Sequence, residues 1–216
     1  MTTRILLADD QAEVRIGFRL ILDSQPDMEV VGEAEDGLQA VELARRLKPD
    51  VVLADIRMPR MNGLEVTRLL AGEEAAEPVR VIVVTTFDLD EYVHTALRNG
   101  ACGFLLKRSG PPLLVEAVRA AMAGDAMISP SVTVRLLKHL HDPQRRRAYS
   151  PAEDLTDREV EIARLVAKGM TNAEVGGELF ISAGTVKTHI ANVQRKLAVR
   201  NRVGIAAWVW ENDRMG

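Results

Sequence analysis

Five short apolar runs, each followed by a longer stretch with helical spacing, constrain the fold of this chain more than any other feature. In the longer stretches, apolar residues recur three and four positions apart, so these stretches predict amphipathic helices. Strands that alternate with helices predict a parallel sheet with helices on both faces. We therefore predict an α/β domain with a doubly wound, five-stranded parallel sheet. The predicted strands are Ile5–Ala8, Met28–Val31, Val51–Ala54, Val79–Val84 and Gly103–Leu106.

Polar side chains follow four of these strands. Asp9 and Asp10 follow the first strand and Asp55 follows the third, while Thr85 and Lys107 follow the fourth and fifth. In such a sheet, ligands bind beyond the carboxyl ends of the strands. Crowded carboxylates need raised pKa values or a cation, and Mg²⁺ binds carboxylates together with phosphate oxygens. The set therefore predicts an aspartate that accepts a phosphoryl group beside Mg²⁺, with the lysine and threonine as donors to that group.

The composition excludes several classes of protein. Among 216 residues there is one cysteine, Cys102, which excludes an intrachain disulfide and a cysteine-based zinc site. The longest apolar runs are far shorter than the ~20 residues that a membrane span needs, and the charged start of the chain leaves no room for a secretory signal. We expect a soluble, cytoplasmic protein with no membrane insertion.

Residues 124–153 are expected to connect two domains. Prolines bracket one short helical stripe from Val132 to Leu140, and the basic run Arg145–Arg147 follows it. Such a stretch is typical of a linker that contains one short helix. The expected parts are a domain at 1–123, the linker at 124–153 and a small all-α domain at 154–216.

Residues 154–216 carry the signals of a helix-turn-helix domain. Thr156 and Thr171 each begin a capping box, and Ser182 is placed to cap a third helix. The stretch 172–197 has the order short helix, turn, longer helix, which is the order of a DNA-binding helix-turn-helix. This part of the chain therefore predicts a domain that binds double-stranded DNA.

The longer helix has an apolar stripe formed by Val186, Ile190, Val193 and Leu197, so its opposite side faces outward. The outward side chains can donate hydrogen bonds to guanine, form hydrogen bonds with adenine or contact a thymine methyl group. Basic side chains nearby can bind the phosphate groups of the DNA backbone. The outward set is Lys187, Thr188, Ala191, Asn192 and Arg195, and the phosphate set is Arg195, Lys196, Arg200 and Arg202.

The first 123 residues resemble the receiver domain of two-component response regulators, which has a flavodoxin-like fold. The resemblance is carried by DDQ at 9–11, DIRMPRMNG at 55–63, VVTT at 83–86 and GFLLK at 103–107.

This resemblance assigns roles to the residues at the strand ends. It implies that Asp55 receives a phosphoryl group from a sensor histidine kinase. It also implies that Asp9, Asp10, Asp55 and the backbone carbonyl of Arg57 hold Mg²⁺. The switch residues that it implies are Thr85, Phe104 and Lys107, with the aromatic ring swinging inward after phosphorylation.

Residues 155–202 resemble the LuxR-type helix-turn-helix, so the whole chain resembles a response regulator of the NarL/FixJ type. Gly176 and Gly177 depart from the family pattern, and each is expected to cost about 0.5–1 kcal/mol relative to alanine inside a helix. The positions that the resemblance assigns to base contacts are Lys187, Thr188 and Ala191, and those that it assigns to phosphate contacts are Thr185 and Lys196.

Two kinds of enzyme are disfavoured by the same residues. A flavin or dinucleotide enzyme needs a phosphate-binding loop after the first strand, where Asp9 and Asp10 would repel a phosphate. A phosphatase with an aspartate nucleophile needs a second carboxylate two residues after Asp55, where Arg57 stands. We therefore expect a transcription regulator and no enzyme. The alternative that stays open is a regulator controlled by protein partners without phosphorylation.

The last helix predicts a homodimer on DNA. It carries two apolar stripes, one that includes Trp208 and one that includes Trp210. A domain this small can bury one stripe in its own core, which leaves the other for a second copy of the chain.

Overall fold

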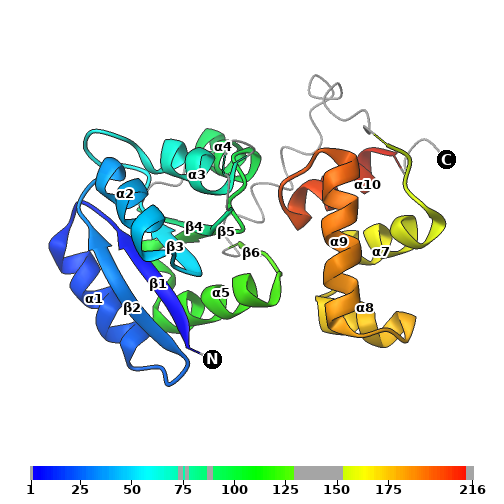
Figure 1. The fold of residues 1–216 in the computed structure, drawn as a ribbon, viewed down its shortest axis with the longest axis horizontal. Coiled ribbons are helices and arrows are strands. Elements are labelled where there is room, and N and C mark those ends of the chain that lie inside the picture. The colour runs from blue at the N-terminus through cyan, green and yellow to red at the C-terminus, as the bar shows by residue number, and fades with distance from the viewer. Residues whose placement is uncertain (1, 73–74, 76–77, 87–89, 129–152, 213–216) are drawn as a thin grey trace.

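A sheet of six parallel strands forms the first part of the molecule (Figure 1). The computed structural model describes residues 2–72, 75, 78–86, 90–128 and 153–212. The strand order is β2-β1-β3-β4-β5-β6, and every neighbouring pair is parallel. The strands are β1 (Thr3–Ala8), β2 (Met28–Ala34), β3 (Val51–Ala54), β4 (Arg80–Thr85), β5 (Gly103–Leu106) and β6 (Met127–Ile128).

Helices cover both faces of this sheet, because alternate residues of each strand face opposite sides. On β1, Ile5 and Leu7 pack in the cluster that holds α1 and α5, whereas Leu6 packs in the cluster that holds α2 and α3. Figure 1 shows these two helix layers on either side of the sheet. The helices are α1 (Ala12–Asp23), α2 (Gly37–Leu47), α3 (Gly63–Ala71), α4 (Asp90–Arg98) and α5 (Pro111–Ala123). We call this part, β1 to β6 with its helices, the sheet domain.

The sixth strand corrects the expectation of five. In β6, Met127 and Ile128 pair with Gly103 and Phe104 of β5, so the sheet continues past residue 123 into the expected connector. A strand of two residues is too short to show a period-two apolar pattern, so the sequence carries no signal for it. The doubly wound parallel architecture itself is confirmed.

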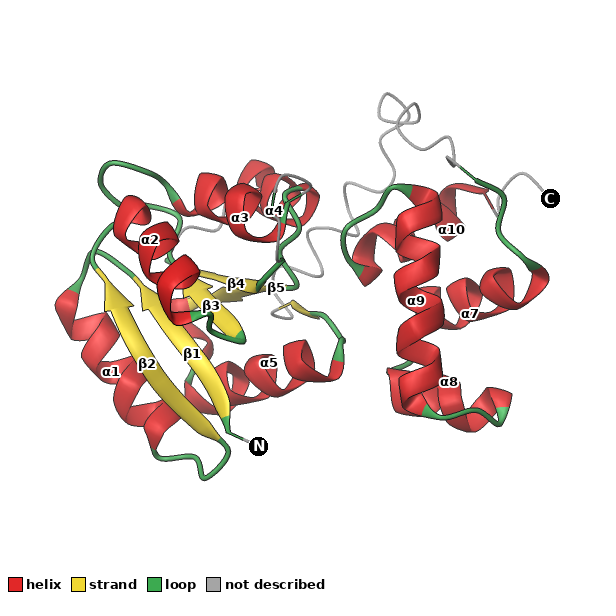
Figure 2. Ribbon diagram, viewed as in Figure 1, coloured by secondary structure: helices red, strands yellow, loops and turns green. Residues whose placement is uncertain are grey.

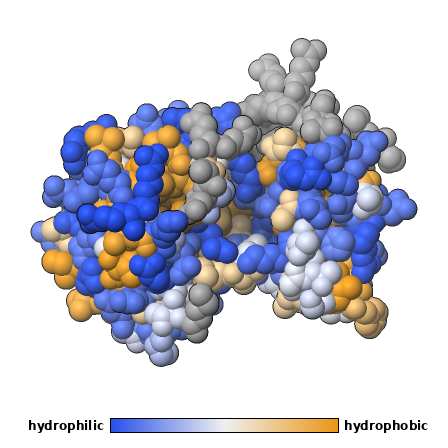
Figure 3. All heavy atoms as spheres, viewed as in Figure 1, coloured by the Kyte–Doolittle hydropathy of each residue, from blue (hydrophilic) through white to orange (hydrophobic). Residues whose placement is uncertain are grey.

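Four helices form a second, separate core that we call the helical domain (Figure 2). Both predicted capping boxes are present, at Thr156 with Glu159 and at Thr171 with Glu174. The Ser182 side chain accepts a hydrogen bond from the Thr185 N–H, as predicted. In the view of Figure 3, hydrophilic residues cover most of this domain. Its helices are α7 (Asp157–Ala167), α8 (Asn172–Leu179), α9 (Ala183–Leu197) and α10 (Arg202–Asn212).

The predicted linker helix at Val132 to Leu140 and the basic run Arg145–Arg147 lie outside the described residues. Within the ranges that the structure does describe, no helix is both long enough and apolar enough to span a bilayer.

Candidate functional site

The strand-end residues of the sheet domain meet at one edge of the sheet. Ala8 of β1 pairs with Ala54 of β3, so the residues that follow them, Asp9 and Asp55, become neighbours. Asp10 completes a group of three carboxylates whose nearest oxygen atoms all lie within 4.8 Å of one another. The Lys107 Nζ atom lies 2.6 Å from Asp9 Oδ2 and 2.8 Å from Asp55 Oδ2. The structure therefore brings together four side chains from three distant parts of the sequence.

Burial shapes the charge state of this group. Asp9 and Asp55 are each only 3% exposed, whereas Asp10 is exposed. Burial raises the pKa of Asp9 above its ordinary value, although hydrogen bonds from Lys107 and the Gln11 N–H oppose this effect. Burial lowers the pKa of Lys107, but its hydrogen bonds to Asp55 and Asp9 outweigh this and hold that pKa above its ordinary value. Lys107 is thus the charged partner of two buried carboxylates.

The donor set fits a hard divalent cation. Three carboxylates from two strand ends supply oxygen ligands, which Mg²⁺ prefers, and the exposed Asp10 keeps the group open to solvent. Asp10 and Arg57 line the same cleft, of about 410 Å³, so the residue whose backbone carbonyl is expected to join the carboxylates lies beside them. These residues can hold Mg²⁺ and leave room for a phosphoryl group.

The loop between β3 and α3 fixes the main chain around Asp55. The Asp55 Oδ1 atom accepts a hydrogen bond of 2.6 Å from the Ile56 N–H, and the Ile56 carbonyl accepts one of 2.9 Å from the Gly63 N–H. A Cβ atom at Gly63 would overlap the Asp55 carbonyl, so only glycine allows this close approach. Arg60, in the same loop, has a positive φ of 62° and forms an ion pair with Asp36 at the start of α2.

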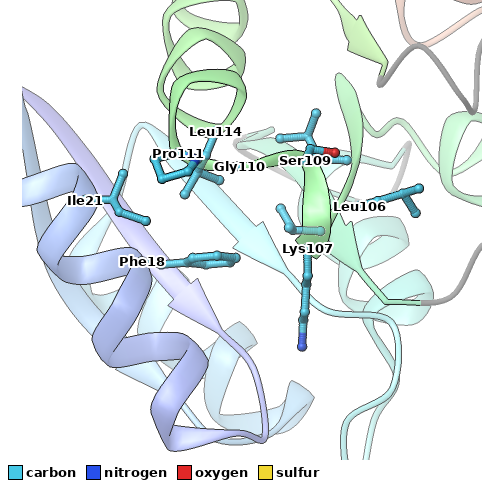
Figure 4. Close-up of a pocket in the computed structure, with 10 residues that line it drawn as sticks. Phe18, Ile21, Leu106, Lys107, Ser109, Gly110, Pro111 and Leu114 are labelled. Carbon is cyan, nitrogen blue, oxygen red and sulfur yellow. The ribbon is translucent and has the colours of Figure 1, made fainter.

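The three expected switch residues lie on neighbouring strands. Thr85 ends β4 and is fully buried, and Lys107 follows β5. Figure 4 shows the Lys107 stem beside a small pocket of about 70 Å³, with its ammonium group pointing away from the apolar side chains. Phe104 is fully buried and packs in one cluster with Val83 and Val93. The ring therefore already lies inward in this structure, and the expected swing stays a prediction.

In the helical domain, α8, the turn and α9 form a helix-turn-helix. Val186, Ile190, Val193 and Leu197 are buried, as predicted. The opposite side of α9 is exposed and presents the expected base-contact and phosphate residues to solvent. The exposed members of the predicted set are Thr185, Lys187, Thr188, Ala191, Asn192 and Arg195.

Acidic residues at the start of the helical domain form ion pairs with two of the basic residues that are predicted to bind phosphates. Arg195 Nη1 lies 2.5 Å from Glu153 Oε1, and both side chains are exposed. Lys196 Nζ lies 2.8 Å from Glu159 Oε2, and both of these side chains are largely buried. The acidic start of this domain therefore offsets part of the charge that the sequence had assigned to phosphates.

The two domains meet through polar contacts that sequence reasoning missed. The Asn201 side-chain N–H group donates to the carbonyls of Leu97 and Ala101, over 2.8 and 3.0 Å. The side chain of Asn172, at the start of α8, donates to the Ala123 carbonyl over 3.0 Å. Buried polar residues at element ends have no distinctive sequence pattern, so no signal could have identified these two asparagines.

Asp125 lies at the centre of this contact. Its Oδ1 atom accepts hydrogen bonds from the Asn172 N–H and from Arg202. Burial lowers the pKa of Arg202, against the opposing effect of Asp125. Close by, a Cβ atom built on Gly124 would lie 3.6 Å from Lys187 Cε. The stem of the predicted base-contact residue Lys187 thus lies close to the sheet domain, although the residue is exposed like the rest of its set.

Comparison with known proteins matches both domains. Residues 5–119 match the family model described as response regulator receiver domain, and residues 153–209 match bacterial regulatory proteins of the luxR family. The transcriptional regulatory protein LiaR of Bacillus subtilis is 42% identical over 209 residues, which covers 97% of each chain. The nitrate/nitrite response regulator protein NarL of Escherichia coli K12 is 38% identical and is matched over 95% of this chain and 94% of its own.

A solved structure agrees with these relatives. The response regulator ChrA, from a heme-sensing two-component system, is 35% identical and aligns with a TM-score of 0.54 over 98% of both chains. Fold, domain order and sequence identity over nearly the whole length therefore point to one family. The chain belongs to the DNA-binding response regulators of two-component systems, which join a receiver domain to a LuxR-type helix-turn-helix and regulate transcription.

Proposed function

We propose that Asp55 is the phosphoacceptor of this response regulator and that a sensor histidine kinase is its donor. The observation that carries this proposal is the position of Asp55 between Asp9 and Lys107 at the edge of the sheet. An Asp55 oxygen attacks the phosphorus atom, the bond from phosphorus to the donor nitrogen breaks, and an acyl phosphate forms.

The neighbouring residues have distinct parts in this proposal. Asp9, Asp10, Asp55 and the Arg57 carbonyl hold Mg²⁺, which when bound offsets charge on the phosphoryl oxygens. Lys107 moves its hydrogen bonds from the carboxylates to the new dianion, because a phosphoryl oxygen accepts a charge-assisted bond from an ammonium group. The switch residues Thr85 and Phe104, next to it, pass this change on to the surface of the sheet domain.

The helical domain supplies the output. We assign base contacts to Lys187, Thr188, Ala191 and Asn192 on α9 and phosphate contacts to Thr185, Arg195, Lys196 and Arg200. An α-helix can enter the major groove only when its outward side is free. Because the sheet domain lies close to the stem of Lys187 at Gly124, a DNA duplex would meet the sheet domain at this end of α9, and phosphorylation is proposed to favour separation of the domains.

A homodimer completes the proposal. Trp208 packs with the core of the helical domain, while Trp210 is 49% exposed on α10, which supports one inward and one outward apolar stripe. Two copies joined in this way would address two half-sites on the DNA. We propose that the sheet domain extends to Ile128, because β6 belongs to its sheet, that the linker expected at 124–153 begins after this strand, and that the DNA-binding domain spans 154–216. We also propose a cytoplasmic location for a regulator that must reach DNA.

A regulator that works without phosphorylation is not favoured, because the chain has the full set of acidic, hydroxyl and lysine residues at the site. Incubation with a small acyl phosphate and Mg²⁺, followed by intact mass measurement, tests the proposal. The wild type and the surface control Asp27→Asn should gain about 80 Da, the mass of one phosphoryl group, whereas Asp55→Asn should gain nothing. Labelling of Asp55→Asn at the wild-type level would exclude Asp55 as the acceptor.

A further inference from the structure

We infer that Arg15, on α1, is a positioning residue of the metal site: it holds the peptide group between Asp9 and Asp10 and thereby sets the affinity for Mg²⁺. This inference rests on the proposed function, which places Mg²⁺ at these carboxylates. Arg15 itself is not among the expected ligands, and its guanidinium group contacts the main chain of the site.

Two contacts define the position of Arg15. Its Nη1 atom donates a hydrogen bond of 2.7 Å to the carbonyl oxygen of Asp9. Its Nε atom donates one of 3.2 Å to Glu33 Oε2 at the end of β2. The side chain is only 15% exposed, so the guanidinium group is held in one place between the strand end and Glu33.

The orientation of the Asp9 carbonyl affects the position of the next residue, Asp10. Because the peptide group is planar, the orientation of this oxygen also sets the nitrogen and Cα positions of Asp10. On its other side, the Asp9 N–H donates to the Ala34 carbonyl over 3.0 Å, so the main chain of Asp9 is held at both ends. Asp10 is exposed, and the direction of its carboxylate therefore depends on the main chain that carries it.

Glu33 explains how the positively charged Arg15 can lie beside a site proposed to bind Mg²⁺. Its carboxylate binds Arg15 through Oε2 and Arg19 through Oε1, the latter over 2.6 Å. Glu33 therefore offsets positive charge that would repel Mg²⁺, while the hydrogen bond to Asp9 remains. Groups that orient metal ligands in this way are typically worth 10–100-fold in metal affinity.

Arg19 offers a matched control. It shares Glu33 with Arg15, and its other contacts are with the Val30 carbonyl and Asp23, away from the metal site. The experiment measures Mg²⁺ binding to the full-length, unphosphorylated protein by titration calorimetry, for the wild type, Arg15→Ala, Arg15→Lys, Arg15→Met and Arg19→Ala. Thermal unfolding of each variant without Mg²⁺ accompanies the titrations.

The direction in which the Mg²⁺ affinity changes distinguishes a positioning role of Arg15 from the effect of its positive charge. Removing a positive charge alone would strengthen Mg²⁺ binding, since like charges repel. Loss of positioning should instead weaken it, by about tenfold in Arg15→Ala, with Arg15→Lys between this variant and the wild type because it keeps one donor. Arg19→Ala should bind within about twofold of the wild type, since it leaves the Asp9 carbonyl contact in place.

Each outcome decides a different question. Suppose that Arg15→Ala unfolds cooperatively, which shows that it is folded, and binds Mg²⁺ as tightly as the wild type or more tightly. This result would overturn the positioning role and leave the proposed function intact. If Arg15→Ala does not fold, Arg15→Met decides, because it keeps an apolar stem and has no donor for the Asp9 carbonyl, and wild-type affinity in that variant would overturn the role as well. Failure of the wild type itself to bind Mg²⁺ would count against the proposed metal site instead.

Discussion

Lys196 on α9 and Glu159 on α7 form a largely buried ion pair, with 2.8 Å between Nζ and Oε2, that ties the DNA-binding helix to the first helix of its own domain. Glu159 also closes the capping box of α7, because its Oε2 atom accepts a hydrogen bond from the Thr156 N–H. Burial raises the pKa of Glu159, but hydrogen bonds from Lys196 and Thr156 outweigh it and lower the pKa to about 2.

We predict that this pair makes the helical domain sensitive to acid. A carboxylate with a lowered pKa stabilises the folded state above its unfolded pKa of about 4.5, and this contribution is lost as the pH falls towards 2. Glu159→Gln should cost on the order of 2 kcal/mol at pH 7 and much less at pH 2.5. Urea unfolding followed by tryptophan fluorescence measures this, since both tryptophans lie in α10.

The control for this prediction is Glu153→Gln. Glu153 pairs with Arg195, but both side chains are exposed, so the loss should be below about 1 kcal/mol at either pH. Equal losses for the two variants would contradict the structural role that we give to the buried pair.

Thr85 should couple phosphorylation to DNA binding. Thr85→Ala keeps Asp55 and the carboxylates, so it should still gain one phosphoryl group. It loses the hydroxyl donor to the phosphoryl oxygens, so phosphorylation should no longer raise DNA affinity. Electrophoretic mobility shift with and without phosphodonor measures the response, and the exposed neighbour Thr86→Ala serves as control. A wild-type response in Thr85→Ala would rule out the switch role.

Asp125 should hold the unphosphorylated protein in the arrangement that keeps the sheet domain beside Lys187. Asp125→Ala removes the partner of the buried Arg202 only in this arrangement, because Arg202 is solvated once the domains separate. DNA affinity without phosphorylation should therefore rise, by about tenfold. Asp27→Ala, which breaks an exposed ion pair with Arg119 inside the sheet domain, should change nothing. Unchanged binding by Asp125→Ala would mean that this contact does not restrain the protein.

Contacts to bases and to phosphates should respond differently to mutation. In the phosphorylated protein, Lys187→Ala should relax base preference at one position and cost about 1–3 kcal/mol. Arg200→Ala should weaken binding to all sequences alike and lower the salt slope by about one unit. Binding to a selected site and to its single-base variants, at several salt concentrations, distinguishes them. A uniform loss for Lys187→Ala would remove it from the base contacts.

Two adjacent glycines in α8 should give opposite results. A Cβ atom at Gly176 would lie 2.6 Å from the Ile181 carbonyl in the turn, so Gly176→Ala should destabilise the helical domain. At Gly177 such an atom meets nothing within 4 Å, so Gly177→Ala should stabilise the domain by about 0.5–1 kcal/mol. Urea unfolding of the two variants compares them directly, and stabilisation by both would refute the close approach at Gly176.

These glycines mark a limit of prediction from the sequence. Helix propensity alone assigned both residues the same cost, because the clash at Gly176 depends on where the following turn passes. The strand ends were predictable for the opposite reason. Once Ala8 and Ala54 are expected in neighbouring parallel strands, the positions of Asp9 and Asp55 follow from the register.

The contacts between domains were beyond the reach of the sequence. Asn172 and Asn201 are buried by residues that lie far away in the chain, and their acceptors are main-chain carbonyls. Every residue has a main-chain carbonyl, so the type of the acceptor residue gives no indication of these hydrogen bonds. The short strand β6 was not predicted for a related reason, because only its pairing with β5 defines it.

The polar character of the domain contact sets the energy scale of regulation. Hydrogen bonds of Asn172 and Asn201 are each worth about 1 kcal/mol net, because water replaces them when the domains part. A handful of such bonds holds the two domains together by only a few kcal/mol. Inverting a population from 1:99 to 99:1 takes about 5.5 kcal/mol, which two or three charge-assisted hydrogen bonds to one phosphoryl group can supply. The weakness of the contact is therefore what allows a single covalent modification to reverse it.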